Sequence, residues 1–111
     1  MMRTQTASYV RERSNHRSSG AAGATVVIAD LDEEAGNAAV ATVGSSGALA
    51  VFHRLDVRDA QACSAVVESV VERFGRLDVA FNNAGISGST SLTEDQGLEL
   101  WQRVLDVNLT G

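Results

Sequence analysis

The chain contains 111 residues, of which 44% are hydrophobic, and its formal net charge is -5. This size suits one small domain with a modest core, and the acidic balance argues against a nucleic-acid partner, because phosphate contacts require clustered cations. No apolar run is long enough for an ordinary membrane span and no short apolar stretch marks a secretory signal, so we expect a soluble, cytoplasmic protein.

Residues 1–22 differ in composition from the rest of the chain. They carry four arginines and a single carboxylate, Glu12, whereas the remaining residues are strongly acidic. We expect this segment to be a disordered basic leader and residues 23–111 to form the folded domain. Two alternatives remain open for the leader. Residues 4–10 have some β character, and the arginines and serines also resemble a mitochondrial transit peptide without its helical apolar stripe.

Strands and helices alternate from Ala24 onward. The β-branched run Thr25–Ile28 predicts a buried strand that ends at Asp30. Residues 32–42 are rich in alanine and predict a helix, whose early carboxylates suit the positive end of the helix dipole. Residues 48–55 predict a second strand, which Asp56 closes.

A second helix, a third strand and a last helix follow. Asp59 is placed to cap a helix over residues 60–74, and Gly75 is placed to end it. Apolar residues recur within this helix at steps of three and four, so one face should pack on a sheet. Residues 77–81 predict the third strand, and an irregular stretch leads to a last helix over residues 96–109.

Polar residues recur at the strand ends with a fixed interval. Asp30 and Asp56 are 26 positions apart, and so are Asp56 and Asn82. Strands that alternate with helices at this length require crossovers, which predicts a parallel sheet with helices on its faces. The polar ends would then share one edge, where α/β proteins bind ligands.

Five short motifs, in this order and spacing, resemble the short-chain dehydrogenase/reductase family. They are Val26-Val27-Ile28-Ala29-Asp30, Leu55-Asp56-Val57, Gly75-Arg76-Leu77-Asp78, Asn82-Asn83-Ala84-Gly85 and Val107-Asn108-Leu109. The resemblance covers residues 23–111 and implies an incomplete Rossmann-like α/β/α fold. It also implies an oxidoreductase that moves hydride between a nicotinamide cofactor and an alcohol or ketone, with a homo-oligomer as a possible assembly.

The resemblance assigns the adenosine part of the cofactor to two strand ends. Asp30, followed by Leu31, would accept hydrogen bonds from the ribose hydroxyls and repel a 2′-phosphate, which favours NAD over NADP. The alternative is that Asp30 only caps the turn into the next helix. Asp56 would accept a hydrogen bond from the adenine amino group, and the Val57 N–H would donate one to a ring nitrogen. The alternative is that Asp56 is an ordinary solvated carboxylate in a turn.

The resemblance also assigns the turn after the third strand and one residue of the last helix. Asn83, Ala84 and Gly85 would line the cofactor, although a purely structural role for this turn is equally open. Asn108 matches the asparagine that kinks its helix and holds a water of the catalytic proton relay, and no metal is implied. An asparagine in a helix is otherwise usually a surface residue.

The chain departs from the family at both ends. It contains no lysine, and its one tyrosine, Tyr9, lies in the leader, so the family's catalytic serine, tyrosine and lysine are missing. The family's glycine-rich phosphate turn is missing as well, because no glycine precedes Gly20. We therefore expect a fragment that is inactive alone. The alternative is a non-catalytic nucleotide-binding or interaction module.

Overall fold

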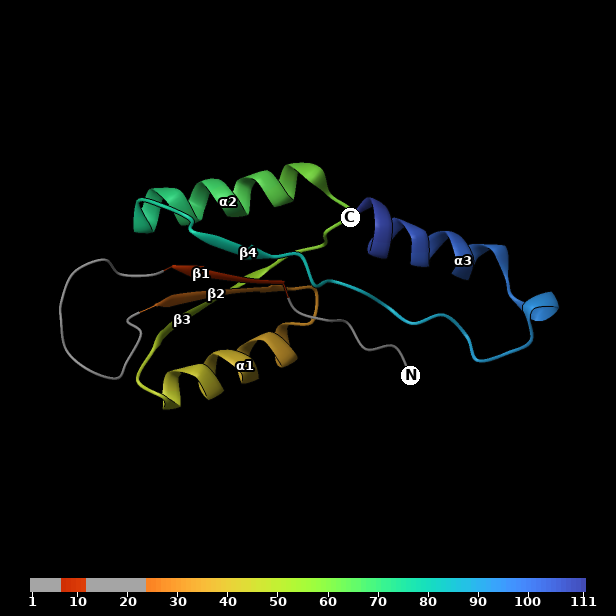
Figure 1. Ribbon diagram of the computed structural model, residues 1–111, viewed down its shortest axis with the longest axis horizontal. Coiled ribbons are helices and arrows are strands. Elements are labelled where there is room, and N and C mark those ends of the chain that lie inside the picture. The colour runs from red at the N-terminus through yellow and green to blue at the C-terminus, as the bar shows by residue number, and fades with distance from the viewer. Residues whose placement is uncertain (1–6, 12–23) are drawn as a thin grey trace.

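A four-stranded sheet forms the centre of the structure, a computed structural model that describes residues 7–11 and 24–111 (Figure 1). The strands are β1 (Ala7–Arg11), β2 (Thr25–Asp30), β3 (Leu49–Arg54) and β4 (Val79–Phe81). Their order across the sheet is β3-β2-β1-β4. Strands β2 and β3 are parallel, whereas β1 is antiparallel to both β2 and β4. Strands β2, β3 and β4 therefore all run in the same direction.

Two helices cover the two faces of this sheet, and a third lies beyond the end of the strands. They are α1 (Glu33–Ser45), α2 (Ala60–Phe74) and α3 (Leu98–Leu105), with a 3-10 turn at Thr93–Asp95 and a π-helical turn at Asp106–Thr110. Figure 1 shows α1 and α2 on opposite sides of the sheet and α3 beyond the end of the strands. The predicted three-layer α/β/α fold is thus confirmed. No helix in the described ranges is long and apolar enough to span a membrane.

The two covering helices begin and end as their sequences predict. The Asp32 carboxylate accepts a hydrogen bond from the Ala35 N–H (3.0 Å) and caps α1. The Asp59 carboxylate accepts bonds from the N–H groups of Gln61 and Ala62 and caps α2. Gly75 ends α2 in the left-handed conformation, with φ at 82°, which glycine adopts without steric cost.

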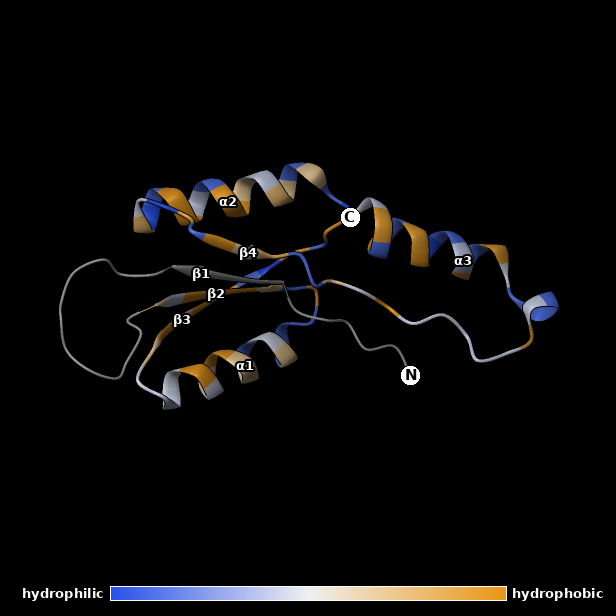
Figure 2. Ribbon diagram, in the orientation of Figure 1, coloured by the Kyte–Doolittle hydropathy of each residue, from blue (hydrophilic) through white to orange (hydrophobic). Residues whose placement is uncertain are grey.

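The core lies between the sheet and α2. Its buried members come from β2, from the segment after β3 and from one face of α2. They are Val27, Ala29, Leu55, Val66 and Val70. Apolar residues dominate β3 and β4, whereas α1 and α2 alternate between polar and apolar residues (Figure 2). This alternation is the pattern of a helix with one face on a sheet.

The strand β1 departs from the sequence-based expectation. It belongs to the segment expected to be a disordered leader, yet it occupies the central position between β2 and β4. The weak β character noted over residues 4–10 accounts for it, because β2 and β4 both need a neighbour for their backbone groups. The remainder of the expected leader, residues 1–6 and 12–22, lies outside the described residues.

The direction of β1 has a simple chain-geometry reason. Arg11 at its end pairs with Thr25 at the start of β2, so the chain can pass between the two strands at one edge of the sheet. A parallel β1 would require a crossover from the opposite edge, usually through a helix.

The last predicted elements are shorter in the structure. Strand β4 begins at Val79 and not at Leu77, which packs against the core instead. Helix α3 begins at Leu98 and gives way to the π-helical turn at Asp106. Helix α1 extends to Ser45, three residues past its predicted end.

Candidate functional site

The polar strand ends predicted from the 26-residue interval do share one edge of the sheet. Asp30 at the end of β2 is opposite Arg54 at the end of β3, and Asp56 follows two residues later. Strand β4 runs in the same direction, so Asn82 directly after it lies at this edge too. The Leu55 N–H donates to the Asp30 carbonyl oxygen (2.9 Å) and ties the ends of β2 and β3 together.

A first hollow at this edge contains five of the predicted site residues. They are Asp30, Leu31, Asp56, Val57 and Ala84. Its volume is about 60 Å³, which is small compared with the several hundred Å³ of a typical ligand pocket.

Asp30 is the most deeply buried of these polar residues, with 4% of its surface exposed. One oxygen of its carboxylate, Oδ1, accepts a hydrogen bond from the Asp32 N–H (3.0 Å). Asp30 thus does cap the turn into α1, as the alternative interpretation predicted.

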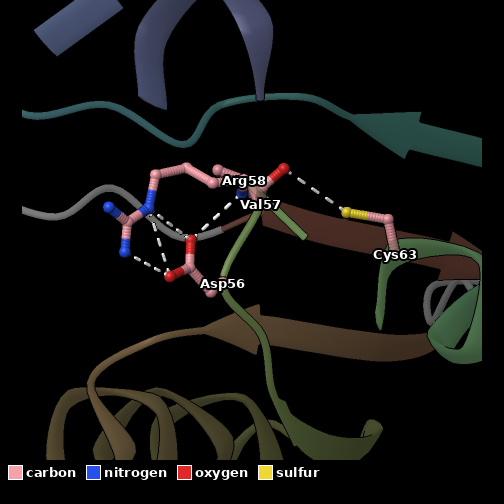
Figure 3. Close-up of polar contacts among 4 residues, drawn as sticks. All are labelled: Asp56, Val57, Arg58 and Cys63. Atoms are coloured by element: carbon pink, nitrogen blue, oxygen red, sulfur yellow. Dashed lines mark hydrogen bonds and ion pairs between the residues drawn. The ribbon is translucent and has the colours of Figure 1, made fainter. Parts of the chain in front are cut away.

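The Asp56 carboxylate is held by Arg58 (Figure 3). The Arg58 guanidinium donates from Nη2 to Oδ2 (2.6 Å), and this hydrogen bond and ion pair lower the pKa of Asp56 to about 2. Asp56 is therefore an ionised acceptor at neutral pH. The carbonyl oxygen of Val57 accepts a contact from the Cys63 thiol at 3.6 Å, which ties this loop to α2.

A second hollow, of about 400 Å³, adjoins the first and contains the other predicted residues. Asn83, Gly85 and Asn108 line it, and Ala84 lines both hollows. The Asn108 side chain accepts a hydrogen bond from the Ile86 N–H (2.8 Å) and donates one to the Ile86 carbonyl oxygen (3.0 Å). This reciprocal pair fixes the π-helical turn against the loop after β4, across 22 residues of sequence.

The structure adds residues that the sequence analysis did not select. Arg58, Ile86, Arg103 and Val107 also line the first hollow. The four-residue interval between Arg103 and Val107 places them on one helical face, which is a signal visible in the sequence. Within the part of the chain that the structure describes, no group of three or more His, Cys, Asp or Glu side chains is placed to hold a metal.

The antiparallel β1 changes the edge at which its neighbouring loop begins. Ala7, at the start of β1, pairs with Ala29, beside the sheet edge that carries Asp30. Arg11, at the end of β1, pairs with Thr25 at the opposite edge. A segment that follows β1 therefore begins at the opposite edge of the sheet. In Rossmann-like folds the phosphate-binding turn follows a parallel strand and begins at the carboxyl ends of the strands.

Comparison with known proteins places the chain among dehydrogenases. The profile of the family described as short chain dehydrogenase matches residues 16–111. Cyclohexanol dehydrogenase of Acinetobacter sp. (strain SE19) is 39% identical over 87 residues, which cover 78% of this chain and 35% of that protein. Trans-4-hydroxycyclohexanecarboxylate dehydrogenase of Sinomonas cyclohexanicum is 43% identical over 95 residues, with 80% and 36% covered.

A solved structure gives the same result for the fold. The crystal structure of NAD+-bound xylitol dehydrogenase superposes with a TM-score of 0.74 and 35% sequence identity. The match covers 78% of this chain and 33% of that one. The chain thus matches about a third of the length of these relatives.

Proposed function

The chain belongs to the short-chain dehydrogenase/reductase family of oxidoreductases, and on this premise we propose that it forms the adenosine-binding half of an NAD site. In the whole protein, this site would serve hydride transfer between NAD and an alcohol or ketone. The observation that carries the proposal is the first hollow, where Asp30, Asp56, Val57 and Ala84 converge from three strand ends.

The chemistry of the first hollow suits adenosine with free ribose hydroxyls. The Asp30 carboxylate would accept hydrogen bonds from those hydroxyls, and its negative charge would repel a 2′-phosphate. Beside it, the ionised Asp56 would accept from the adenine amino group, and the Val57 N–H would donate to a ring nitrogen. These placements support NAD over NADP.

The second hollow suits the nicotinamide half. Asn83, Ala84 and Gly85 would line the cofactor there, and Asn108 would orient a water for the proton relay of the whole protein. When bound, the nicotinamide ring accepts or supplies the hydride. Asn108 is well held for such a role, because both polar atoms of its side chain bond to Ile86.

We propose further that these 111 residues bind the cofactor without turning it over. The family's tyrosine and lysine act together on the reacting hydroxyl, and this sequence contains no lysine. The second candidate, an interaction module without nucleotide binding, is favoured by exposed apolar residues such as Val79 and Phe81 of β4.

Calorimetry with the 111-residue chain tests the proposal. NAD should bind more tightly than NADP, and Asp30→Asn should remove the difference. Glu68→Gln is the matched control, because it removes one carboxylate from the exposed face of α2, outside both hollows. No heat with NAD would refute the NAD site as a whole, and equal affinity for NADP in the unmodified chain would refute the assignment of Asp30. Formation of NADH with a secondary alcohol would contradict the absence of turnover.

Gly85→Ala tests independently whether the cofactor occupies the second hollow. An added Cβ would meet the Asn108 Oδ1 at 3.5 Å, an ordinary van der Waals contact, so the fold should tolerate alanine. We expect the variant to keep its thermal stability and to lose NAD affinity. Unchanged NAD affinity would place the cofactor away from this turn.

A further inference from the structure

Arg58 holds the Asp56 carboxylate from two directions. Its backbone N–H donates to Oδ1 (3.0 Å), and its guanidinium donates from Nε to Oδ1 (2.9 Å) and from Nη2 to Oδ2 (2.6 Å). A third guanidinium contact runs from Nε to Oδ2 at 3.2 Å. Figure 3 shows how the side chain folds back over its own loop to make them. A carboxylate held by one backbone and several side-chain bonds has one orientation.

This arrangement uses the two carboxylate oxygens unequally. Each oxygen offers about two acceptor positions. Oδ1 receives the backbone N–H and the Nε–H, whereas Oδ2 receives one short bond from Nη2 and the long Nε contact. The single Nε–H is shared between the two oxygens, so three N–H groups of Arg58 face about four acceptor positions, and the one left over lies on Oδ2. Both Asp56 and Arg58 line the first hollow.

We propose that Arg58 is a positioning residue that orients the Asp56 carboxylate toward the base of the bound dinucleotide and thereby makes the site select adenine over hypoxanthine. The inference rests on the proposed NAD site. Adenine presents an amino donor beside a ring-nitrogen acceptor, which matches the Asp56 carboxylate and the Val57 N–H. Hypoxanthine presents a carbonyl oxygen and a ring N–H at the same positions, so both contacts would be mismatched.

A second arginine–aspartate ion pair in the chain, with the same two-residue spacing, serves as a comparison. Arg76 and Asp78 are also two residues apart and joined through the guanidinium, with Nε donating to the Asp78 Oδ1 at 2.6 Å. That pair lines neither hollow. Exposed pairs of this kind contribute little to stability. The Arg58 pair differs because its carboxylate also takes the Arg58 backbone N–H and stands in the first hollow.

The test compares NAD with its deaminated analogue, nicotinamide hypoxanthine dinucleotide. Calorimetry on the unmodified chain should give about tenfold or more tighter binding of NAD, the discrimination expected of a hydrogen bond to a charged acceptor. Arg58→Gln should bring the two affinities within about threefold of each other. Arg58→Lys should not restore the selectivity, because an ammonium keeps the charge but lacks the two-atom fork. Arg76→Gln is the control and should keep the selectivity.

The outcomes distinguish the positioning role of Arg58 from the proposed NAD site. Full selectivity in Arg58→Gln, or rescue by Arg58→Lys, would overturn the positioning role. Equal binding of both dinucleotides by the unmodified chain would also overturn it, while leaving the NAD site in place. No binding of NAD at all would overturn the NAD site and this inference together. The pKa of Asp56 is measured by NMR of its carboxyl carbon. A higher pKa in Arg58→Gln than in the unmodified chain confirms that the variant has released the carboxylate.

Discussion

Gly36→Ala is the sharpest test of how α1 is seated on the sheet. Gly36 is the buried residue of α1 and faces Phe52 of β3. A Cβ at this position would lie 2.0 Å from Phe52 Cε2, 2.4 Å from Cδ2 and 2.8 Å from Cζ. These separations are far inside van der Waals contact, so either the ring or the helix must move.

Two opposing effects set the size of the change. Inserting a methyl group into a packed contact typically costs about 1–3 kcal/mol. Replacing glycine by alanine inside a helix returns about 1 kcal/mol. The net expectation is a loss of up to about 2 kcal/mol, and each kcal/mol lowers the melting temperature of a domain of this size by about 4–8 °C.

Thermal unfolding followed by circular dichroism measures this change, and Gly44→Ala is its control. Gly44 belongs to the same helix, but an added Cβ there meets nothing within 4 Å. Gly44→Ala should therefore raise the melting temperature slightly while Gly36→Ala lowers it. If Gly36→Ala raises the melting temperature as much as Gly44→Ala does, the close packing of α1 on Phe52 is refuted.

Three further predictions concern caps, charge and the loop after β4. Asp59→Ala should cost about 1 kcal/mol in urea unfolding, because it removes the cap of α2, and an unchanged midpoint would refute the cap. The pKa of Asp56 is lowered from 3.8 to about 2, so its contribution to stability is complete above pH 3.8 and is lost as the pH falls through 2. Solvent screening limits this contribution to about 1 kcal/mol, and Asp56→Asn should remove this part of the pH dependence. Asn108→Ala should cost about 1–2 kcal/mol, because it removes both bonds to Ile86, and Asn108→Asp, which keeps the acceptor alone, should lie between it and the unmodified chain.

The sequence predicted some elements well because their signals are local. Helix α2 begins and ends at the predicted residues, since Asp59 caps one end and the left-handed Gly75 closes the other. The shared edge of the strand ends also followed from the sequence, because the 26-residue interval requires crossovers. The last helix was predicted less well. Its change to a π-helical turn at Asp106 accompanies the contact of Asn108 with a loop 22 residues away.

By itself, the sequence determined the family, the α/β alternation and the residues that stand at the ligand edge. Those features depend on periodicity, on capping residues and on short motifs, which are all local in the sequence. Only the tertiary structure decided that β1 fills the centre of the sheet in the antiparallel direction, because strand pairing joins residues that are distant in sequence. It likewise decided that Arg58 holds Asp56 inside the first hollow, since a two-residue interval in a turn leaves the direction of a side chain open.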